Sequence, residues 1–359
     1  MDLIALMRDV ILSESPDLHL HVGEPPVIRM KTGELGTLDH PPLTEEDIRT
    51  AINGITSDDQ KKRFAENHEL DFSYHVGEVS RFRVNIFEER KGPAVAFRVI
   101  SEKIPTFEDL GLTDVVAGLA NLPHGLVLVT GTTGMGKTTT LASIVNHINQ
   151  TQKNHIITIE DPIEFVYPQG QSLVTQREVN VHTHTFANAI RSALREDPDV
   201  VMVGEMRDLE TIAAAITLAE TGHLVFSTLH TSDAAQTVDR IIDVFPPYQQ
   251  QQIRAQLAGT LKGVISQVLI PRADGAGRVA AREVMIVNDA VRNCISKGET
   301  HQIYSMIQLG AQQGMVLLDQ SLIELVRQGL ITPEEALTKA DDLESFQAQL
   351  SQIRQPAYA

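Results

Sequence analysis

The sequence is poor in cysteine, since Cys294 is the single one in 359 residues. One thiol cannot form a disulfide within the chain or supply the several thiolates of a zinc cluster. No apolar run approaches the roughly 18 residues of a membrane span, and the first residues lack the basic stretch and cleavage site of a signal peptide. We therefore expect a cytoplasmic protein that does not itself insert into a membrane.

Positive charge is also scarce. The chain has 47 Asp and Glu against 30 Lys and Arg, a formal net charge of −17. No block of about five or six like charges provides a local basic patch. DNA and anionic lipid repel such a surface, so we expect no nucleic-acid partner. Low-complexity tracts are absent as well, and the length suits two or three folded domains.

The first 100 residues mix short strands and helices. Their pattern is typical of a small α+β domain. We expect strands at residues 17–22, 70–76, 81–87 and 94–100. The polar stretch that follows has one proline, one glycine and no sustained period, so we predict a domain over 1–100 and a linker over 101–111.

From about Leu126 the pattern changes to short apolar strands separated by amphipathic helices. This alternation predicts an α/β fold with a parallel sheet covered on both faces. The expected strands are 126–130, 155–159, 200–203 and 223–229. We predict a core over 112–272, then a mostly helical region over 273–359 that contains one strand-like segment, "RVAAREVMIV".

One glycine-rich motif stands between the first of these strands and a helix. Gly131 and Gly136 bracket four residues and precede Lys137 and Thr138. In this context backbone N–H groups surround a β-phosphate, the lysine reaches the β and γ oxygens, and the hydroxyl ligates Mg²⁺. We therefore predict ATP binding with Mg²⁺. The predicted loop comprises Gly131, Thr132, Thr133, Gly134, Met135, Gly136, Lys137, Thr138 and Thr139.

Polar residues follow the other strands of the expected sheet. They are Glu160, Asp161 and Glu164, then Gly204 and Glu205, then Thr228 and His230. Because ligands bind beyond the carboxyl ends of parallel strands, we expect these groups to converge on the nucleotide. Glu205 suits a carboxylate that orients the attacking water. No Asp closes its strand, so we expect Thr138 and water to hold Mg²⁺, with Asp161, Glu164 or Glu205 contributing.

Two histidines bracket the last predicted strand. A neutral imidazole near the γ-phosphate can sense it by hydrogen bonding. We expect this role for His230 and for His223.

Three arginines lie on neighbouring strands of the first domain, Arg81, Arg83 and Arg98. Their spacing fits a solvated face with surface ion pairs. The alternative is an arginine finger that a neighbouring subunit supplies, and spacing alone, which favours the solvated face, does not decide between them.

The motifs together resemble the secretion-type hexameric ATPases, most closely the type IV pilus retraction ATPases of twitching motility. The resemblance covers nearly the whole chain. It rests on "DLHL", "GEPPVIR", "TGTTGMGKTTT", "TIEDPIE", "VVMVGEMRD", "AETGHLVFSTLHTSDA" and "VISQVLIPRADGAGRVAAREVM", in that order.

This resemblance implies a PAS-like N-terminal domain, a RecA-like ATPase domain and a homohexamer that binds ATP between subunits. It also implies a cytoplasmic motor at the inner membrane that drives pilus retraction, with the pilus platform protein and a paralogous retraction ATPase as partners. The implied site residues are Glu160, Asp161 and Glu164, Glu205 as the catalytic carboxylate, His223 and His230, and the trans-acting Arg83 and Arg98 with Arg81 beside them.

The sequence departs from the family pattern in two places. Thr132 and Met135 replace the usual Pro and Ser of the phosphate loop, which we expect to alter loop stiffness and turnover. The second departure is the retraction-linked segment, which reads "AVRNCISK". Arg292 and Asn293 follow the family pattern there, and other residues of the segment do not.

Other functions compete with this interpretation. An accessory retraction ATPase shares the same motifs. Pilus assembly and type II secretion ATPases commonly carry a four-cysteine insertion, which a single cysteine excludes. A nucleotide-dependent docking switch would bind ATP with little turnover, and a DNA translocase is disfavoured by the net charge of −17.

Overall fold

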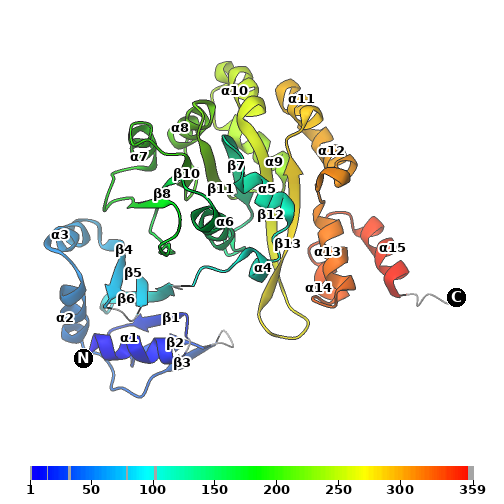
Figure 1. Cartoon of the computed structure of the whole chain (residues 1–359). Helices are drawn as coiled ribbons and strands as arrows, with labels where there is room; N and C mark the ends of the chain where they lie inside the picture. Colours follow the sequence, from blue (N-terminus) through cyan, green and yellow to red (C-terminus); the bar gives the residue numbers. More distant parts are fainter. Residues whose placement is uncertain (1, 14, 31–33, 78–79, 101–102, 355–359) are drawn as a thin grey trace. The chain divides into compact units, whose positions relative to one another are not determined.

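The computed structural model describes residues 2–13, 15–30, 34–77, 80–100 and 103–354. The chain forms two compact units (Figure 1). The N-terminal unit comprises Met1–Lys103 and Pro162–Val166, and the C-terminal unit comprises Ile104–Asp161 and Tyr167–Ala359. No helix in these described ranges combines the length and hydrophobicity that a membrane span requires.

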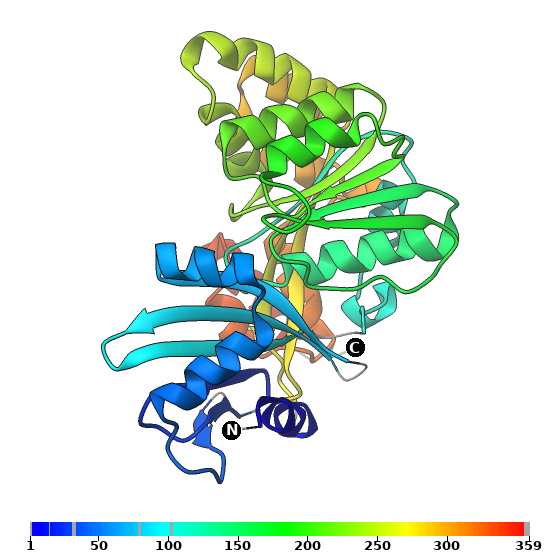
Figure 2. The ribbon, with the colours of Figure 1, turned by 90° about the vertical axis from the view of Figure 1, so that its left-hand side faces the viewer.

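The N-terminal unit is built on an antiparallel sheet in the order β3-β2-β1-β6-β5-β4, whose β5–β6 hairpin is cyan in Figure 2. The strands are β1 (Asp17–Leu20), β2 (Val27–Arg29), β3 (Leu35–Thr37), β4 (Glu69–Val76), β5 (Ser80–Glu89) and β6 (Gly92–Ile100). The helices are α1 (Leu3–Leu12), α2 (Glu45–Ile55) and α3 (Asp58–Asn67).

One face of this sheet packs on helices α1 and α2. Along β5, Phe82, Val84 and Ile86 are fully buried in that core. The residues between them are less buried because successive side chains of a strand point to opposite faces. Arg81 and Arg83 therefore lie on the open face, and the strand register places Arg98 directly opposite Arg83.

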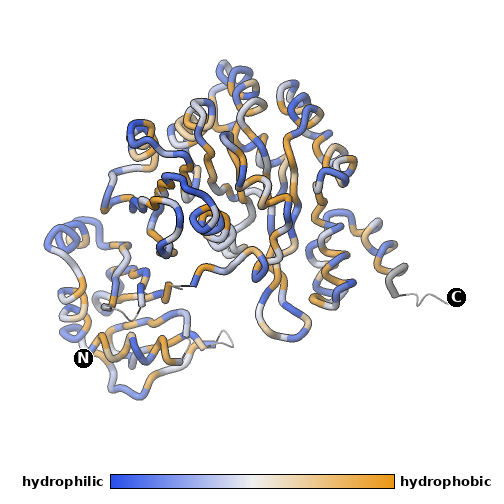
Figure 3. Tube along the Cα trace, in the orientation of Figure 1, coloured by the Kyte–Doolittle hydropathy of each residue, from blue (hydrophilic) through white to orange (hydrophobic). Residues whose placement is uncertain are grey.

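The C-terminal unit has a seven-stranded sheet in the order β13-β12-β7-β11-β10-β8-β9. All neighbouring pairs are parallel except β12–β13. The strands are β7 (Gly125–Thr130), β8 (His155–Glu160), β9 (Leu173–Glu178), β10 (Val200–Val203), β11 (Leu224–Leu229), β12 (Leu261–Pro271) and β13 (Arg278–Ile286). Figure 3 shows their hydrophobic character in orange.

Helices cover both faces of this sheet. A large core on one face joins the sheet to α7 (Phe186–Ala193), α8 (Leu209–Glu220), α9 (Ala234–Asp243), α10 (Pro247–Thr260), α11 (Asp289–Lys297) and α12 (Ile303–Leu309). The other face carries α6 (Lys137–Thr151), which packs with α4 (Phe107–Leu110) and α5 (Asp114–Ala120). The predicted RecA-like α/β class is confirmed.

The end of the chain packs on the hairpin of β12 and β13. Its helices are α13 (Leu318–Arg327), α14 (Pro333–Leu337) and α15 (Leu343–Arg354), preceded by the 3₁₀ turns η1 (Thr300–Gln302) and η2 (Ala311–Gln313). Ile270, Ala281, Leu322 and Phe346 form a small core there.

The division of the chain differs from the predicted boundaries in three places. The core does not end at residue 272, because β13 belongs to the same sheet as β12. Of the predicted linker, residues 101–102 lie outside the described residues, and the part from Ile104 onward belongs to the C-terminal unit, where it forms α4. The segment Pro162–Val166 belongs to the N-terminal unit, although the sequence gives no sign of this excursion.

Candidate nucleotide-binding site

The glycine-rich loop connects the carboxyl end of β7 to α6, as the sequence predicts. Its three glycines, Gly131, Gly134 and Gly136, have φ angles of 145°, 80° and 78°. Residues that carry a side chain rarely adopt such φ angles. A Cβ on Gly131 would in addition lie 2.5 Å from the backbone oxygen of Gln267, so this position accepts glycine alone.

The start of α6 has the properties of an anion site. Its N-cap residue is Gly136, and no side chain caps the helix. The first N–H groups of a helix carry a partial positive charge and favour phosphate. Lys137 is 8% exposed, and its Nζ donates to the carbonyl oxygens of Gly131 (2.8 Å) and Thr132 (3.1 Å). The ammonium group is therefore held within the loop.

Gln267 on β12 fixes this loop from the side. Its Nε2 donates to the carbonyl oxygen of Met135, and its Oε1 accepts from Thr140 Oγ1 at 2.9 Å. The Met135 sulfur accepts from the backbone N–H of Leu269. The sequence-based interpretation missed Gln267, and the signal for it is a polar residue within the apolar run "VISQVLI".

Glu205 follows β10 and lies beside two basic groups. Its Oε1 is 2.7 Å from Arg207 Nε, and its Oε2 is 3.7 Å from His230 Nε2. The other ring nitrogen of His230, Nδ1, is 3.5 Å from Lys137 Nζ. Parallel strands thus bring the loop lysine, the histidine and the carboxylate together. Burial, and secondly the charge of Lys137, lower the pKa of His230, so its imidazole is neutral at pH 7.

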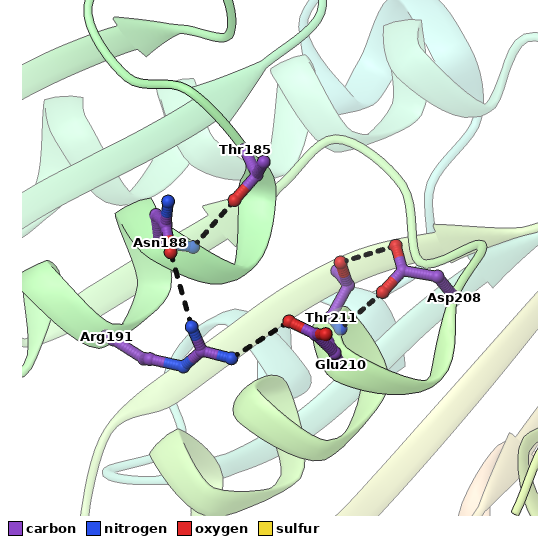
Figure 4. A network of polar contacts seen from close by, with 6 residues as sticks. All are labelled: Thr185, Asn188, Arg191, Asp208, Glu210 and Thr211. Carbon is purple, nitrogen blue, oxygen red and sulfur yellow. Dashed lines mark hydrogen bonds and ion pairs between the residues drawn. The ribbon is translucent and has the colours of Figure 1, made fainter.

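The chain after Glu205 is held by a network of polar contacts (Figure 4). Asp208 caps α8, accepting from the N–H and the hydroxyl of Thr211 at 2.9 and 2.8 Å. Arg191 of α7 joins Asn188 to Glu210 of α8. Two adjacent helices are therefore linked at the point where the chain leaves the candidate site.

The acidic motif after β8 is divided between the two units. Glu160 is 3% exposed and accepts from Thr158 Oγ1 (2.6 Å) and Gln176 Nε2 (3.1 Å). Asp161, the next residue, is exposed in the same unit. Glu164 belongs to the N-terminal unit, where its charge raises the pKa of Arg98 after the larger effect of the Asp17 hydrogen bond.

His223 lies at the other edge of the sheet. It precedes β11, and its carbonyl accepts from Gly125 at the start of β7. Its Nδ1 contacts the Leu218 carbonyl oxygen at 3.0 Å and Thr221 Oγ1 at 3.1 Å. Six strand residues lie between it and His230, which places the two histidines about 23 Å apart at the rise of a β-strand. The structure thus brings His230 to the phosphate loop and leaves His223 at the opposite end of β11, and the sensing role expected for His223 stays a prediction.

The arginines of the N-terminal unit are held by acidic or hydroxyl partners on the open face. Arg98 Nε is 2.7 Å from Asp17 Oδ1, and Arg83 Nε is 3.8 Å from Asp71 Oδ1. Arg81 Nη2 donates to Ser73 Oγ at 2.8 Å. Arg83, Arg98 and Asp17 line a cavity of about 330 Å³.

A second cavity, of about 980 Å³, borders the phosphate loop within the C-terminal unit. Gly136, Thr139 and Thr140 form one wall. Gln267, Leu269, Arg278 and Arg282 of the β12–β13 hairpin also line it, and α13 and the segment between α4 and α5 close the sides. Its size is within the usual range for small-molecule sites.

Metal ligands were sought among the side chains that the structure describes. Among the described residues, no group of three or more His, Cys, Asp or Glu is placed to hold an ion. Mg²⁺ commonly enters with nucleotide phosphates and takes only one or two protein ligands. The Thr138 hydroxyl, on the second residue of α6, fits that arrangement.

Comparisons with known proteins place the chain in a family. A family model described as type II/IV secretion system protein matches residues 4–276. The chain is 49% identical over 346 residues to the type IV pilus retraction ATPase PilT of Pseudomonas aeruginosa, covering 96% of this chain and 100% of that protein. It is 50% identical over 321 residues to the twitching motility protein of Neisseria gonorrhoeae, covering 89% and 86%.

A solved structure and a paralogue complete the comparison. A crystal structure of the pilus retraction motor PilT with bound ADP superposes with a TM-score of 0.90 at 45% identity, covering 97% of this chain and 99% of that one. The type IV pilus ATPase PilU of Pseudomonas aeruginosa is 38% identical over 341 residues, covering 95% and 89%.

Proposed function

The chain belongs to the type II/IV secretion system protein family, and from this premise we propose that it is an ATP-hydrolysing motor that powers type IV pilus retraction. One observation carries the catalytic part: Lys137, His230 and Glu205 meet at the carboxyl edge of one parallel sheet. Similarity to retraction ATPases over nearly the whole chain supports the mechanical part. The lower identity to PilU favours the main motor over the accessory one.

The phosphate loop binds the triphosphate. The N–H groups at the start of α6 and Lys137 neutralise the β- and γ-phosphates. Thr138 contributes its hydroxyl to Mg²⁺, which supplies further charge neutralisation when it is bound with ATP. Asp161 and Glu164 are expected to contribute through water.

Glu205 orients the water that attacks the γ-phosphate. One of its oxygens contacts Arg207 and the other contacts His230, and these two contacts fix the orientation of the carboxylate. The water oxygen bonds to phosphorus, the bond to the β–γ bridging oxygen breaks, and the water proton leaves toward the carboxylate or the phosphate product. His230, which is neutral, hydrogen-bonds near the γ-phosphate and passes its presence to α9, which begins four residues later.

The second wall of the site comes from a neighbouring subunit of a homohexamer. Arg83 and Arg98, with Arg81 beside them, lie on the open sheet face with exposed or half-exposed guanidinium groups. Each is held by a partner of its own unit, which orders the side chain before it meets a nucleotide. Arginines in trans would stabilise the charge that develops during phosphoryl transfer. In this proposal the ring acts at the cytoplasmic face of the inner membrane on the pilus platform protein, with a paralogous ATPase as a further partner.

The test combines a point substitution with a cellular readout. Glu205→Gln should keep Mg–ATP binding, lower kcat by at least 100-fold and leave cells with excess pili that do not retract. Glu210→Gln is the matched control, because Glu210 is an exposed carboxylate five residues away whose partner is Arg191. Full hydrolysis by the Glu205 variant would refute the catalytic assignment.

The deletion mutant decides between retraction and its alternatives. Cells without the gene should carry excess pili, whereas bald cells would indicate an assembly motor. A docking switch would keep its cellular output in the Glu205→Gln variant, since that variant still binds ATP.

A further inference from the structure

Arg282 of β13 is a half-buried arginine, and no acidic partner contacts its guanidinium among the described residues. Its guanidinium lines the 980 Å³ cavity beside the phosphate loop. The Nε atom has no hydrogen-bond partner in the described part of the chain, and Nη1 makes one long contact of 3.5 Å with the Gly111 carbonyl oxygen. Burial alone lowers the pKa of this guanidinium to about 10, with no nearby carboxylate offsetting the effect.

Such an arrangement needs an explanation. Buried charged side chains are nearly always paired or hydrogen-bonded, because desolvation is otherwise costly. Three carboxylates line the same cavity, those of Glu108, Asp109 and Glu324, and none of them pairs with Arg282 among the described contacts. The guanidinium of Arg282 therefore borders a cavity that a ligand can fill, and no described carboxylate neutralises its charge.

The strand register places Arg282 close to the nucleotide loop. Arg282 is directly opposite Gln267 in the antiparallel β12–β13 pair, so the two side chains share one sheet face. Gln267 itself contacts Met135 and Thr140. The cavity also touches Thr139, the residue after the proposed magnesium ligand. It thus begins where the phosphate loop ends.

We propose that Arg282 is a specificity-determining residue that donates hydrogen bonds to the base of the bound purine nucleotide. The inference rests on the proposed function, since the phosphate loop accounts for the phosphates and leaves the nucleoside half of ATP to the adjoining cavity. A guanidinium offers five donors and no acceptor. It therefore recognises acceptor atoms on the ring.

The contact of Arg282 with the base should influence the selectivity between ATP and ITP, because their bases present different hydrogen-bonding groups. Adenine presents N7 as an acceptor next to the N6 amino donor, whereas hypoxanthine presents O6 and N7, two adjacent acceptors that suit a guanidinium. With Arg282 present, the enzyme should therefore accept ITP more readily relative to ATP than it would without this residue. An amide in its place offers one donor and one acceptor, which matches adenine.

The experiment compares ATP with ITP, which differ at position 6 of the purine. kcat/KM is measured for both with Mg²⁺ in the full-length wild type and in three variants. Arg282→Gln should raise the ATP/ITP ratio at least about fivefold, since one bidentate base contact commonly changes discrimination by about 5- to 100-fold. Arg282→Lys, which keeps a donor without an acceptor, should stay within about twofold of wild type.

The matched control is Arg272→Gln. Arg272 lines the same cavity, but Asp274 already accepts three hydrogen bonds from its guanidinium. Its substitution should leave the ATP/ITP ratio unchanged. A ratio is insensitive to the amount of folded enzyme, and melting temperatures verify that each variant is folded.

Two results would overturn the proposal. An ATP/ITP ratio for Arg282→Gln within twofold of wild type would show that Arg282 does not contact the base. An equal rise in Arg272→Gln would show that any charge change in the cavity has the same effect. If the proposed function itself is wrong, the result differs from both of these, because the wild-type protein would then neither bind nor hydrolyse Mg–ATP.

Discussion

Glu283→Gln should remove a pH dependence that one buried carboxyl group gives to the stability of the C-terminal unit. Glu283 on β13 is 4% exposed, and its Oε1 accepts the N–H of Ala234, the first residue of α9, at 2.8 Å. The pKa of this carboxyl is raised to about 7, chiefly by burial and to a smaller extent by the charges of Asp233 and Asp341, against the Ala234 hydrogen bond that lowers it. The folded protein thus binds the Glu283 proton more tightly than the unfolded chain does.

The sign and size of the effect follow from this difference. The ordinary pKa of the group is 4.5, so below that pH both states hold the proton and the folded state keeps its full stability. As pH rises from 4.5 to 7, the unfolded chain releases the proton while the folded chain retains it, and stability falls. Each pKa unit corresponds to about 1.4 kcal/mol, which gives a total loss of about 3 kcal/mol by pH 7.

Urea unfolding at pH steps from 5 to 8, followed by circular dichroism, measures this loss. Glutamine has the same shape, and its Oε1 can still accept the Ala234 N–H, so the variant should show a flatter profile than wild type. Their difference in unfolding free energy should change by about 2.5 kcal/mol across this range. Glu210→Gln, at an exposed carboxylate, serves as the control and should follow wild type. Parallel profiles for wild type and Glu283→Gln would refute the reasoning.

Three further predictions concern the site itself. Gly131→Ala should abolish ATP binding in calorimetry while the protein stays folded, because a φ of 145° and a 2.5 Å approach to a backbone oxygen force the loop to move. Gln267→Leu leaves the Met135 carbonyl and the Thr140 hydroxyl without their hydrogen-bond partner, which costs about 1–3 kcal/mol of free energy. The loop should then bind ATP less well, and the KM for ATP should rise at least tenfold. His230→Ala should lower kcat at least tenfold, whereas His223→Ala should lower the melting temperature and leave the KM unchanged, because its imidazole contacts the Leu218 carbonyl.

Local sequence patterns predicted the elements of the site well. The spacing of Gly131 and Gly136 requires only neighbouring residues, and the structure places that loop between a strand and a helix. The order of apolar strands also sufficed for Glu205 and His230, because parallel strands deliver their carboxyl ends to one edge. The same rule places His223 at the amino edge, because it precedes its strand.

Features that depend on distant pairing were not predictable in this way. Glu164 follows Asp161 by three residues, yet the chain passes into the N-terminal unit between them. The strand β12 was missed, and with it Gln267, which contacts the phosphate loop from 132 residues away along the chain. A single sequence gives no register for such a pair.

The two paired strands nevertheless carry a readable signal. In β12 and β13, "VISQVLI" and "VAAREVM" are apolar runs, each interrupted by two polar residues, and the register sets Ser266 opposite Glu283 and Gln267 opposite Arg282. A polar side chain in a covered strand costs free energy unless it is hydrogen-bonded. Ser266 accepts from Thr130, Gln267 holds the phosphate loop, and Glu283 accepts the N–H at the start of α9. Arg282 is the member of this group whose Nε lacks a partner among the described residues, and the proposed ligand of the adjoining cavity would give its guanidinium one.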